Sequence, residues 1–557
     1  MPPNAKTPAR SLLVLALGMG ILGDVLLRAT PAGAGVSLWI LALAAAAIVR
    51  RPRIAALGGP YPTTPLVIAA AFGLGFAWRD SPGIQALFGA AAFVAGATAF
   101  LDRPARAGVA SHAIAPSAAA VSAALAMPLV LSRARGNDRV AARRGLRIAT
   151  AGALLAALPL IVFGSLFAAA DPLFARYAGD LVESLDRVAR HGAWILGSAW
   201  LVAGLIAGLA LARLPADLEL GSPRPAIGDT MLVALALVLA LFAAFLAVQA
   251  RALVGGQAFV EAQVGLSYAA YARQGFFQLL ACAAIALPLL LGVDWAVGPF
   301  HPRRRRAVVL CLALVATVLA VLTSAARRMA LYVEAYGLTE LRVYASAIMI
   351  WLALAFVAFA VAAARGSRNR FSLHALAAAG VCVLALGALD PPAAIVRYNL
   401  GRAERSGPGF DAGYAGSLGA DAVPELLAGL AGLPRAARCE LADALLARWR
   451  EAGDQDWRSF NLSRSRARAE LAAAAGMLAA TARDCGSGAG APRPRVHATH
   501  DELAGVELER AQHAVGYLGV CEPARDALVD HEPENDLAVA DRAVPGELVP
   551  VALPHDG

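Results

Sequence analysis

The sequence predicts an all-α fold: a polytopic transmembrane helix bundle, followed by a small extramembrane helical C-terminal module and a tail of low order. Three observations predict this class. Hydrophobic residues make up 59% of the 557 residues and charged residues only 16%, and the mean hydropathy of +0.61 is far above that of a soluble protein. Long apolar runs recur throughout residues 1–389. From residue 390 onward the composition becomes acidic.

Apolar runs long enough to cross the ~30 Å hydrocarbon core as helices recur about eleven times. We predict spans at 11–28, 35–49, 64–79, 84–101, 148–170, 194–213, 229–250, 274–293, 306–325, 343–364 and 371–389, which places the bundle in residues 1–389. The segment 107–131 is also apolar, but Pro116 and Pro128 interrupt it, and a crossing here would move the next basic loop to the other side. We therefore expect 107–131 to be re-entrant or to lie on the membrane surface.

The arginine clusters predict the orientation of the chain. They lie at 50–53, 103–106, 133–147, 303–306 and 365–370, all on one side if the N-terminus is cytoplasmic. Everything after Leu389 then lies outside the cytoplasm. Residues 1–389 carry 32 basic and 15 acidic residues, net +17, whereas 390–557 carry 17 arginines and 25 acids, net −8. A basic membrane half suits anionic lipid, so we expect the lipid bilayer as a partner and no nucleic acid.

After Asp390 the apolar runs stop, and residues 390–483 show helical spacing at 424–433, 436–449 and 457–482. We interpret this part as an external helical module. Trp457, Arg458, Asn461, Arg464 and Arg466 recur at helical spacing, and we expect them to dock onto the membrane surface or the elbows described below. Residues 484–557, rich in Gly, Pro and acids, are expected to have low order. In an oxidising compartment two of Cys439, Cys485 and Cys521 could form a disulfide, and the sequence leaves open whether any pair does.

The most polar and aromatic stretch between two spans is Arg327–Ala345. Gly337 is expected to end one helix, and Thr339 to be the N-cap of the next, with Glu340 in its first turn. Two interpretations remain open. The stretch is an interfacial elbow that holds two spans at a fixed angle, or its side chains bind a ligand or partner. The candidates for such a surface are Arg327, Arg328, Tyr332, Glu334, Tyr336, Glu340 and Arg342.

A second stretch of similar chemistry, Gly265–Leu280, adds Tyr268, Tyr271 and Arg273 to this candidate surface. We expect both elbows on the same membrane face, where they could pack against each other.

Four segments carry a family resemblance. The chain is similar, through GLSYAAYARQGFFQLL, YVEAYGLTELRVYA, DPPAAIVRYNLGRA and DWRSFNLSRSRA, to the bacterial membrane family catalogued as domain of unknown function 4173, which is related to family 4153. The resemblance covers residues 145–471. It implies a multi-pass bacterial membrane protein, and it brings no assigned activity or catalytic residue. Together with the orientation predicted from the arginines, it leads us to expect a protein of the bacterial inner membrane with its C-terminus in the periplasm or outside the cell.

Asp24 is the one acid well inside an early span. An intramembrane carboxylate is expensive, so Asp24 either pairs with Arg28 at the span's end or couples the movement of a proton or cation. Gly18, Gly20 and Gly23 spell GxGxxG inside an apolar helix, without the strand that a dinucleotide site requires, and predict close helix packing instead. We expect no metal and no cofactor.

These observations favour a non-enzymatic membrane protein that acts as an assembly or sensing module, and they predict no catalytic residue. The first alternative is a secondary transporter that uses Asp24. The second is a lipid-linked glycosyl or lipid transferase. Such enzymes have an acidic site in a sizeable first external loop, whereas the corresponding loop here is only ATPAGAG.

Overall fold

The computed structural model describes residues 6–28, 31–134, 165–216, 225–264, 276–367, 370–406, 409–451 and 456–486, with parts of 151–163 and residue 218. Two compact units divide the chain, Met1–Gly488 and Ala489–Gly557, and the second lies outside the described residues. The described part is α-helical and contains no strand, apart from an isolated bridge between Leu101 and Leu214. Helices satisfy every backbone hydrogen bond within one segment, which is what a lipid environment requires.

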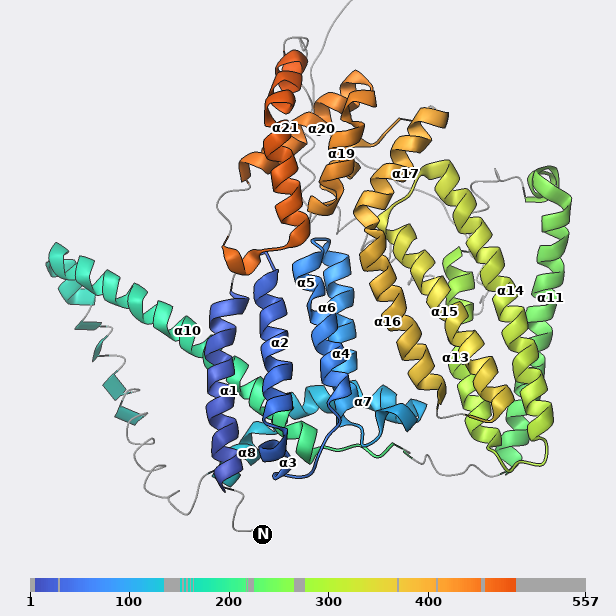
Figure 1. Cartoon of the computed structure of the whole chain (residues 1–557), viewed down its shortest axis with the longest axis horizontal. Coiled ribbons are helices and arrows are strands. Elements are labelled where there is room, and N and C mark those ends of the chain that lie inside the picture. Colours follow the sequence, from blue (N-terminus) through green and yellow to red (C-terminus); the bar gives the residue numbers. More distant parts are fainter. Residues whose placement is uncertain are drawn as a thin grey trace, which may run out of the picture. The chain divides into compact units, whose positions relative to one another are not determined.

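The first group of helices packs around one apolar core (Figure 1). Its members are α1 (Lys6–Leu27), α2 (Ala34–Val49), α3 (Arg51–Ala55), α4 (Thr64–Gly73), α5 (Gly75–Trp78), α6 (Pro82–Ala97), η1 (Thr98–Phe100), η2 (Pro104–Arg106), α7 (Val109–Leu125), α8 (Met127–Ala134) and α10 (Pro172–Leu211). Two of the three glycines in the motif of α1 make the close helix contacts that were predicted, whereas a Cβ at Gly18 would have no neighbour within 4 Å. Gly20 lies against Ile195 and Ala199 of α10, and Gly23 lies against Trp39 and Ser198.

The second group forms its own core from long apolar helices. Its members are α11 (Pro225–Val264), α13 (Phe276–Val297), α14 (Arg304–Tyr336), α15 (Glu340–Arg365) and α16 (Phe371–Leu389). α14 and α15 run antiparallel, joined by the elbow at Gly337. The arginine-rich starts of α14 and ends of α15 therefore lie at the end of the bundle opposite to this elbow.

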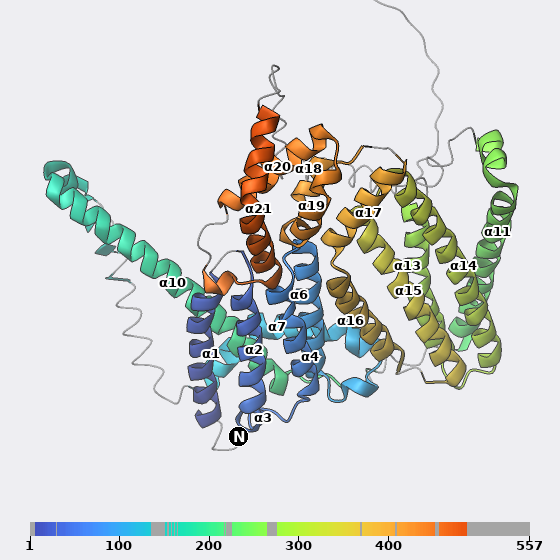
Figure 2. The ribbon, with the colours of Figure 1, turned by 45° about the horizontal axis from the view of Figure 1, so that its top comes forward.

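The C-terminal helices are α17 (Pro391–Ser406), α18 (Ala412–Ser417), η4 (Ala420–Ala422), α19 (Val423–Gly429), η5 (Leu430–Gly432), α20 (Arg435–Glu451), η6 (Trp457–Ser459) and α21 (Leu462–Gly486). Figures 1 and 2 both show α19, α20 and α21 beyond the ends of α2, α5 and α6. They share one apolar core with the bundle. This core contains Phe88 of α6 and Leu386 of α16 together with Leu426 of α19 and Leu441 of α20.

Eight helices of the described part are long and apolar enough to cross a membrane, or nine if α7 and α8 form one broken span. The predicted count of eleven is therefore not confirmed. The predicted span 35–49 lies within α2, a helix of 16 residues, and the predicted span 64–79 divides into α4 and α5. The division has a cause: the Ser37 hydroxyl donates to the Gly73 carbonyl (2.8 Å) and accepts from the Ala77 N–H (3.1 Å), which interrupts the helical ladder. The predicted span 148–170 is described only in part.

Residues 107–131 form α7 and most of α8, which meet at an angle of 49°. Figure 1 shows α7 running across the general direction of α1, α2 and α4. This bend is that of a broken span or a re-entrant segment. That 107–131 does not cross the membrane stays a prediction.

Candidate functional site

The predicted elbow has the expected helix boundaries. α14 ends at Tyr336, Gly337 has a φ of +81°, and α15 begins at Glu340 with Thr339 as its N-cap residue. Asn399 of α17 fixes the turn, because its Oδ1 accepts from the Leu338 N–H (2.7 Å) and its Nδ2 donates to the Leu338 carbonyl (2.9 Å). The elbow is thus held by the chain that follows the last span.

Several side chains of the candidate surface have structural partners. Arg342 lies over the Tyr332 ring at 4.1 Å and donates to the carbonyls of Tyr336 (3.2 Å) and Gly337, so it caps the C-terminal end of α14. Arg328 is buried and donates to Gln249 Oε1 of α11 at 3.1 Å.

Three members of the candidate surface remain exposed: Arg327, Glu334 and Tyr336. Tyr268, Tyr271 and Arg273 lie outside the described residues, and the packing of the two elbows stays a prediction.

Glu340 belongs to a different set of contacts. Its N–H donates to the Tyr414 hydroxyl (3.0 Å), and its carboxylate accepts from the Ser81 hydroxyl (3.3 Å). The Ser81 hydroxyl also lies 3.4 Å from that of Tyr344. Glu340 therefore connects the elbow to the turn between α5 and α6.

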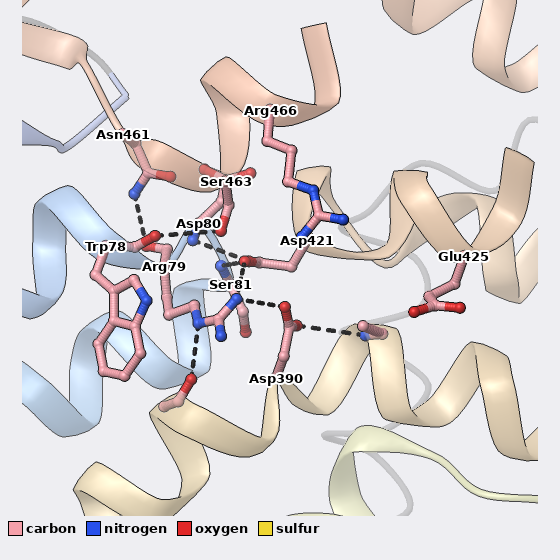
Figure 3. Close-up of polar contacts among 12 residues, drawn as sticks. Trp78, Arg79, Asp80, Ser81, Asp390, Asp421, Glu425, Asn461, Ser463 and Arg466 are labelled. Carbon is pink, nitrogen blue, oxygen red and sulfur yellow. Dashed lines mark hydrogen bonds and ion pairs between the residues drawn. The ribbon is translucent and has the colours of Figure 1, made fainter. Parts of the chain in front are cut away.

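That turn is the centre of a buried polar network, which we call the joint. It comprises Arg79, Asp80, Ser81, Asp390, Asp421, Asn461, Ser463 and Arg464. Figure 3 shows these residues with the exception of Arg464. Asp421 Oδ2 accepts from the backbone N–H groups of Asp80 (2.9 Å) and Ser81 (2.8 Å), at the start of α6. A carboxylate here is favoured because a helix N-terminus has unpaired N–H groups and a positive partial charge. Asp421 thereby anchors η4 to the bundle.

Arg79 connects three elements. Its Nη1 pairs with Asp390, which lies between α16 and α17, and lies 3.5 Å from Asp421 Oδ1. Its Nε donates to the Gly387 carbonyl at 2.7 Å, and its guanidinium lies 5.0 Å from the Trp78 ring centroid. One cation therefore serves two carboxylates.

Arg464 of α21 and Asn461, which directly precedes α21, bind the bundle from the C-terminal side. Arg464 pairs with Asp80 at 2.7 Å and donates to the carbonyls of Ala32 and Ser459, both at 2.6 Å. Asn461 Nδ2 donates to the carbonyls of Phe76 and Arg79, both at 2.8 Å. Phe76 and Arg79 lie at the C-terminal end of α5, where a helix leaves carbonyls without intrahelical partners.

Three carboxylates and two guanidinium groups meet in the joint: Asp80, Asp390 and Asp421 against Arg79 and Arg464. One negative charge is in excess if all are ionised. Burial raises the pKa of Asp390 and its neighbour Asp421 raises it further, while Arg79 opposes both. Asp390 also has the joint's unusual backbone, with a φ of +56°. Burial and a neighbouring carboxylate thus both disfavour the ionised form of Asp390.

Part of this site was predicted from the sequence. Asn461 and Arg464 were expected to dock onto the membrane surface or the elbows, and in the structure they bind the 76–81 turn instead. Arg79, Asp80, Ser81, Asp390 and Asp421 were not predicted as site residues. The available signal was the polar stretch WRDSPG at 78–83 between two apolar runs.

Asp24 of α1 has two partners. Its carboxylate lies 3.2 Å from Arg28 Nη1, as one of the two predicted interpretations required, and 2.6 Å from His191 Nδ1 of α10. These contacts place the acid in a polar cluster near the end of α1.

An apolar pocket of about 280 Å³ lies among α2, α4, α6, α7 and α10. Trp39, Leu43, Leu66, Phe93 and Ile206 are among its lining residues, and Asp24 is not. Among the described residues no group of three or more His, Cys, Asp or Glu side chains could hold a metal ion.

Cys439 of α20 and Cys485 of α21 form a disulfide, with Cα atoms 5.8 Å apart. The sequence had left this pairing open. The bond ties together the two longest C-terminal helices.

The fold and these contacts define a multi-pass α-helical membrane protein. A family model, described as domain of unknown function DUF4153, matches residues 66–429, more than half of the chain, and the chain belongs to this family. The resemblance seen in the sequence was to family 4173, whereas the match is to the related family 4153, and membership of family 4173 itself is not shown. The matched region includes Arg79, Asp80, Asp390 and Asp421 and ends before α21. Comparisons with curated proteins and with solved structures gave no match.

Proposed function

We propose that this chain is a non-enzymatic protein of the bacterial inner membrane, whose elbow and C-terminal helices form a rigid assembly surface on the outer side of the membrane. The observation that carries this proposal is the joint. Its charged side chains point at one another and at helix ends, so they serve to fix the C-terminal helices on the bundle. A surface of this kind presents fixed contacts to a membrane-protein partner.

The disulfide supports the outer position of the C-terminal helices. Bonds such as Cys439–Cys485 persist in oxidising compartments and are rare in the bacterial cytoplasm. The arginines at 303–306 and Arg365 lie at the opposite end of α14 and α15 from the joint, as the positive-inside rule requires of a cytoplasmic end. Both observations support a cytoplasmic N-terminus.

The two alternatives draw less support from the described residues. A transporter that uses Asp24 needs this acid to face a polar path. Asp24 instead contacts Arg28 and His191, and the apolar pocket does not reach it. A transferase needs an acid that is free to act on a substrate, whereas Asp390 and Asp421 share Arg79.

Photocross-linking in cells tests the assembly surface. A photoreactive amino acid replaces Glu334 or Tyr336, both exposed at the elbow, or Arg365, which is equally exposed at the other end of α15. We expect one membrane protein to be cross-linked at both elbow positions and not at position 365. The same cross-link should weaken when Arg464→Ala loosens the joint.

Two results would contradict the proposal. One is the absence of any adduct at both elbow positions in cells that express the chain at its native level. The other is loss of the deletion-strain rescue by Asp24→Asn with normal expression and an intact disulfide, because this outcome would favour transport. Glu334→Gln should lower rescue if the exposed carboxylate contacts the partner.

A further inference from the structure

The first half of α10 leaves the bundle and exposes a row of large apolar side chains. Tyr177, Leu181, Leu185 and Val188 are between 58% and 70% exposed. α10 has 40 residues, so it is about 60 Å long, roughly twice the thickness of the hydrocarbon core. Its second half, from Ala199 onward, is buried against α1 and α7. The two halves therefore have different surroundings.

The exposed half is strongly amphipathic. At 100° per residue, Phe174, Tyr177, Leu181, Leu185 and Val188 fall within one arc of the helix. The opposite arc carries all the charges of this half, namely Arg176, Asp180, Glu183, Asp186, Arg187 and Arg190. A sustained separation of this kind is typical of a helix that lies between water and an apolar phase.

The charged arc needs no protein partner. Glu183 pairs with Arg187 and Asp186 pairs with Arg190, each at 2.9 Å and each within one helical turn. Three arginines and three acids give this half no net charge between Arg176 and Arg190. A protein interface would instead need complementary charges on the other side.

The position of this half along the bundle places it at a membrane surface. His191 contacts Asp24 near the end of α1, where Arg458 of the C-terminal helices donates to the Val25 carbonyl at 2.5 Å. Figure 1 shows α10 inclined to α1, with its first half leaving the bundle near this end. Phe167 and Phe174 pack edge to face at 5.7 Å, and aromatic side chains favour the headgroup level.

We propose that Pro172–Arg190 is an interfacial helix, which lies along the membrane surface on the side of the C-terminal helices and inserts its Tyr177, Leu181, Leu185 and Val188 face into lipid. The occupant of the apolar face is the acyl-chain boundary of the bilayer. Because the charged arc is neutral, insertion depends on apolar area and not on anionic headgroups.

Spin labels at two positions on opposite sides of the helix test this directly. Leu181→Cys lies on the apolar arc, and Glu183→Cys, 200° further round, is the matched control on the charged arc. The full chain is labelled in lipid nanodiscs after Cys282, Cys311, Cys382 and Cys521 are replaced by alanine, with the disulfide retained. Collisions with oxygen, which concentrates in lipid, are compared with collisions with a water-soluble nickel complex.

We expect the label at 181 to collide mainly with oxygen and the label at 183 mainly with nickel, with equal results in zwitterionic and anionic nanodiscs. Nickel access at both positions would show a solvated helix and overturn the proposal. Protection of 181 from both reagents would show a protein contact, from a partner or a second copy, and would also overturn it. The intact Cys439–Cys485 bond on a non-reducing gel checks the fold of each variant.

Discussion

Replacing Arg464 by alanine should release the C-terminal helices from the bundle. Arg464 and Asp80 have side chains 8% and 19% exposed, so their pair is largely shielded from water. Breaking a buried pair by removing one partner costs about 3–5 kcal/mol. Asp80 still accepts from the Ala420 N–H at 3.2 Å after the change, which places the expected cost near the lower end, about 3 kcal/mol. This corresponds to about a 10²-fold shift toward the undocked state.

Hydrogen exchange of the α21 amides in detergent or nanodiscs measures this shift, because opening of the joint precedes their exchange. Arg466→Ala is the control. Arg466 lies two residues after Arg464 on α21. Its side chain is 69% exposed and pairs with Glu470 at 3.0 Å. Such a pair contributes about 0.3–0.5 kcal/mol, so the control should change protection about twofold. Equal protection in both variants would refute the role given to the joint.

A double-mutant cycle separates the pair from other effects of the substitution. If Asp80 and Arg464 stabilise each other, the combined Asp80→Asn and Arg464→Ala change should cost less than the sum of the two single changes. Additive costs would mean that Arg464 acts through its bonds to carbonyl groups alone.

Three further predictions concern other described features. Asp390→Asn should stabilise the chain most at neutral pH, and its advantage over the wild type should vanish as pH falls through the raised pKa of Asp390, as thermal unfolding across pH would show. Gly337→Ala should lower the free energy of unfolding by about 1–3 kcal/mol, because its φ of +81° strains a side chain and the new Cβ would meet a side chain of α17; Gly366→Ala, at φ +67° in open space, is the control for strain alone. Cys439→Ala should cost about 4 kcal/mol by loop entropy over a separation of 46 residues, and Cys485 should react with maleimide in cells only after that change or after reduction.

Each of these has an outcome that would count against it. Wild type and Asp390→Asn with parallel stability profiles across pH would show that the carboxyl keeps its ordinary pKa. The sign follows from proton binding: a pKa raised on folding means that the folded state binds the proton more tightly, so acidification favours it. Equal costs for Gly337→Ala and Gly366→Ala would show that the contact with α17 adds nothing to the cost at Gly337. Ready labelling of Cys485 in untreated wild-type cells would place the C-terminal helices in a reducing compartment.

The helix ends of the elbow could be predicted because their causes are local. Gly337 ends α14 at a positive φ, and Thr339 directly precedes α15, so both helix ends lie where the sequence placed them. The long apolar helices follow equally from composition, because lipid requires about 20 apolar residues in a row. Asp24 and Arg28 are four residues apart, so their contact was also within reach of helical spacing.

The joint could not be predicted in this way. Arg79 and Asp390 are 311 residues apart, and Asp80 and Arg464 are 384 apart, so no local pattern relates them. The same holds for the interruption of the predicted span at 64–79, because Ser37 comes from a neighbouring helix. At the elbow, the sequence suggested that the arginines contribute to a binding surface. In the structure Arg328 donates to Gln249, and Arg342 donates to a carbonyl at the end of α14.

The joint has a consequence for how the chain matures in the cell. Arg464 and Asn461 lie far along the chain, yet they bind carbonyls that two early segments supply, one at Ala32 and the other at Phe76 and Arg79. These acceptors come to one place only when the helices from α1 to α5 have entered the bilayer in the correct orientation. If these helices inserted in the wrong orientation, the guanidinium of Arg464 and the amide of Asn461 would lack their acceptors. The apolar face of the undocked C-terminal helices would then be accessible to proteases. Docking of α21 therefore depends on the correct insertion of the first helices of the chain.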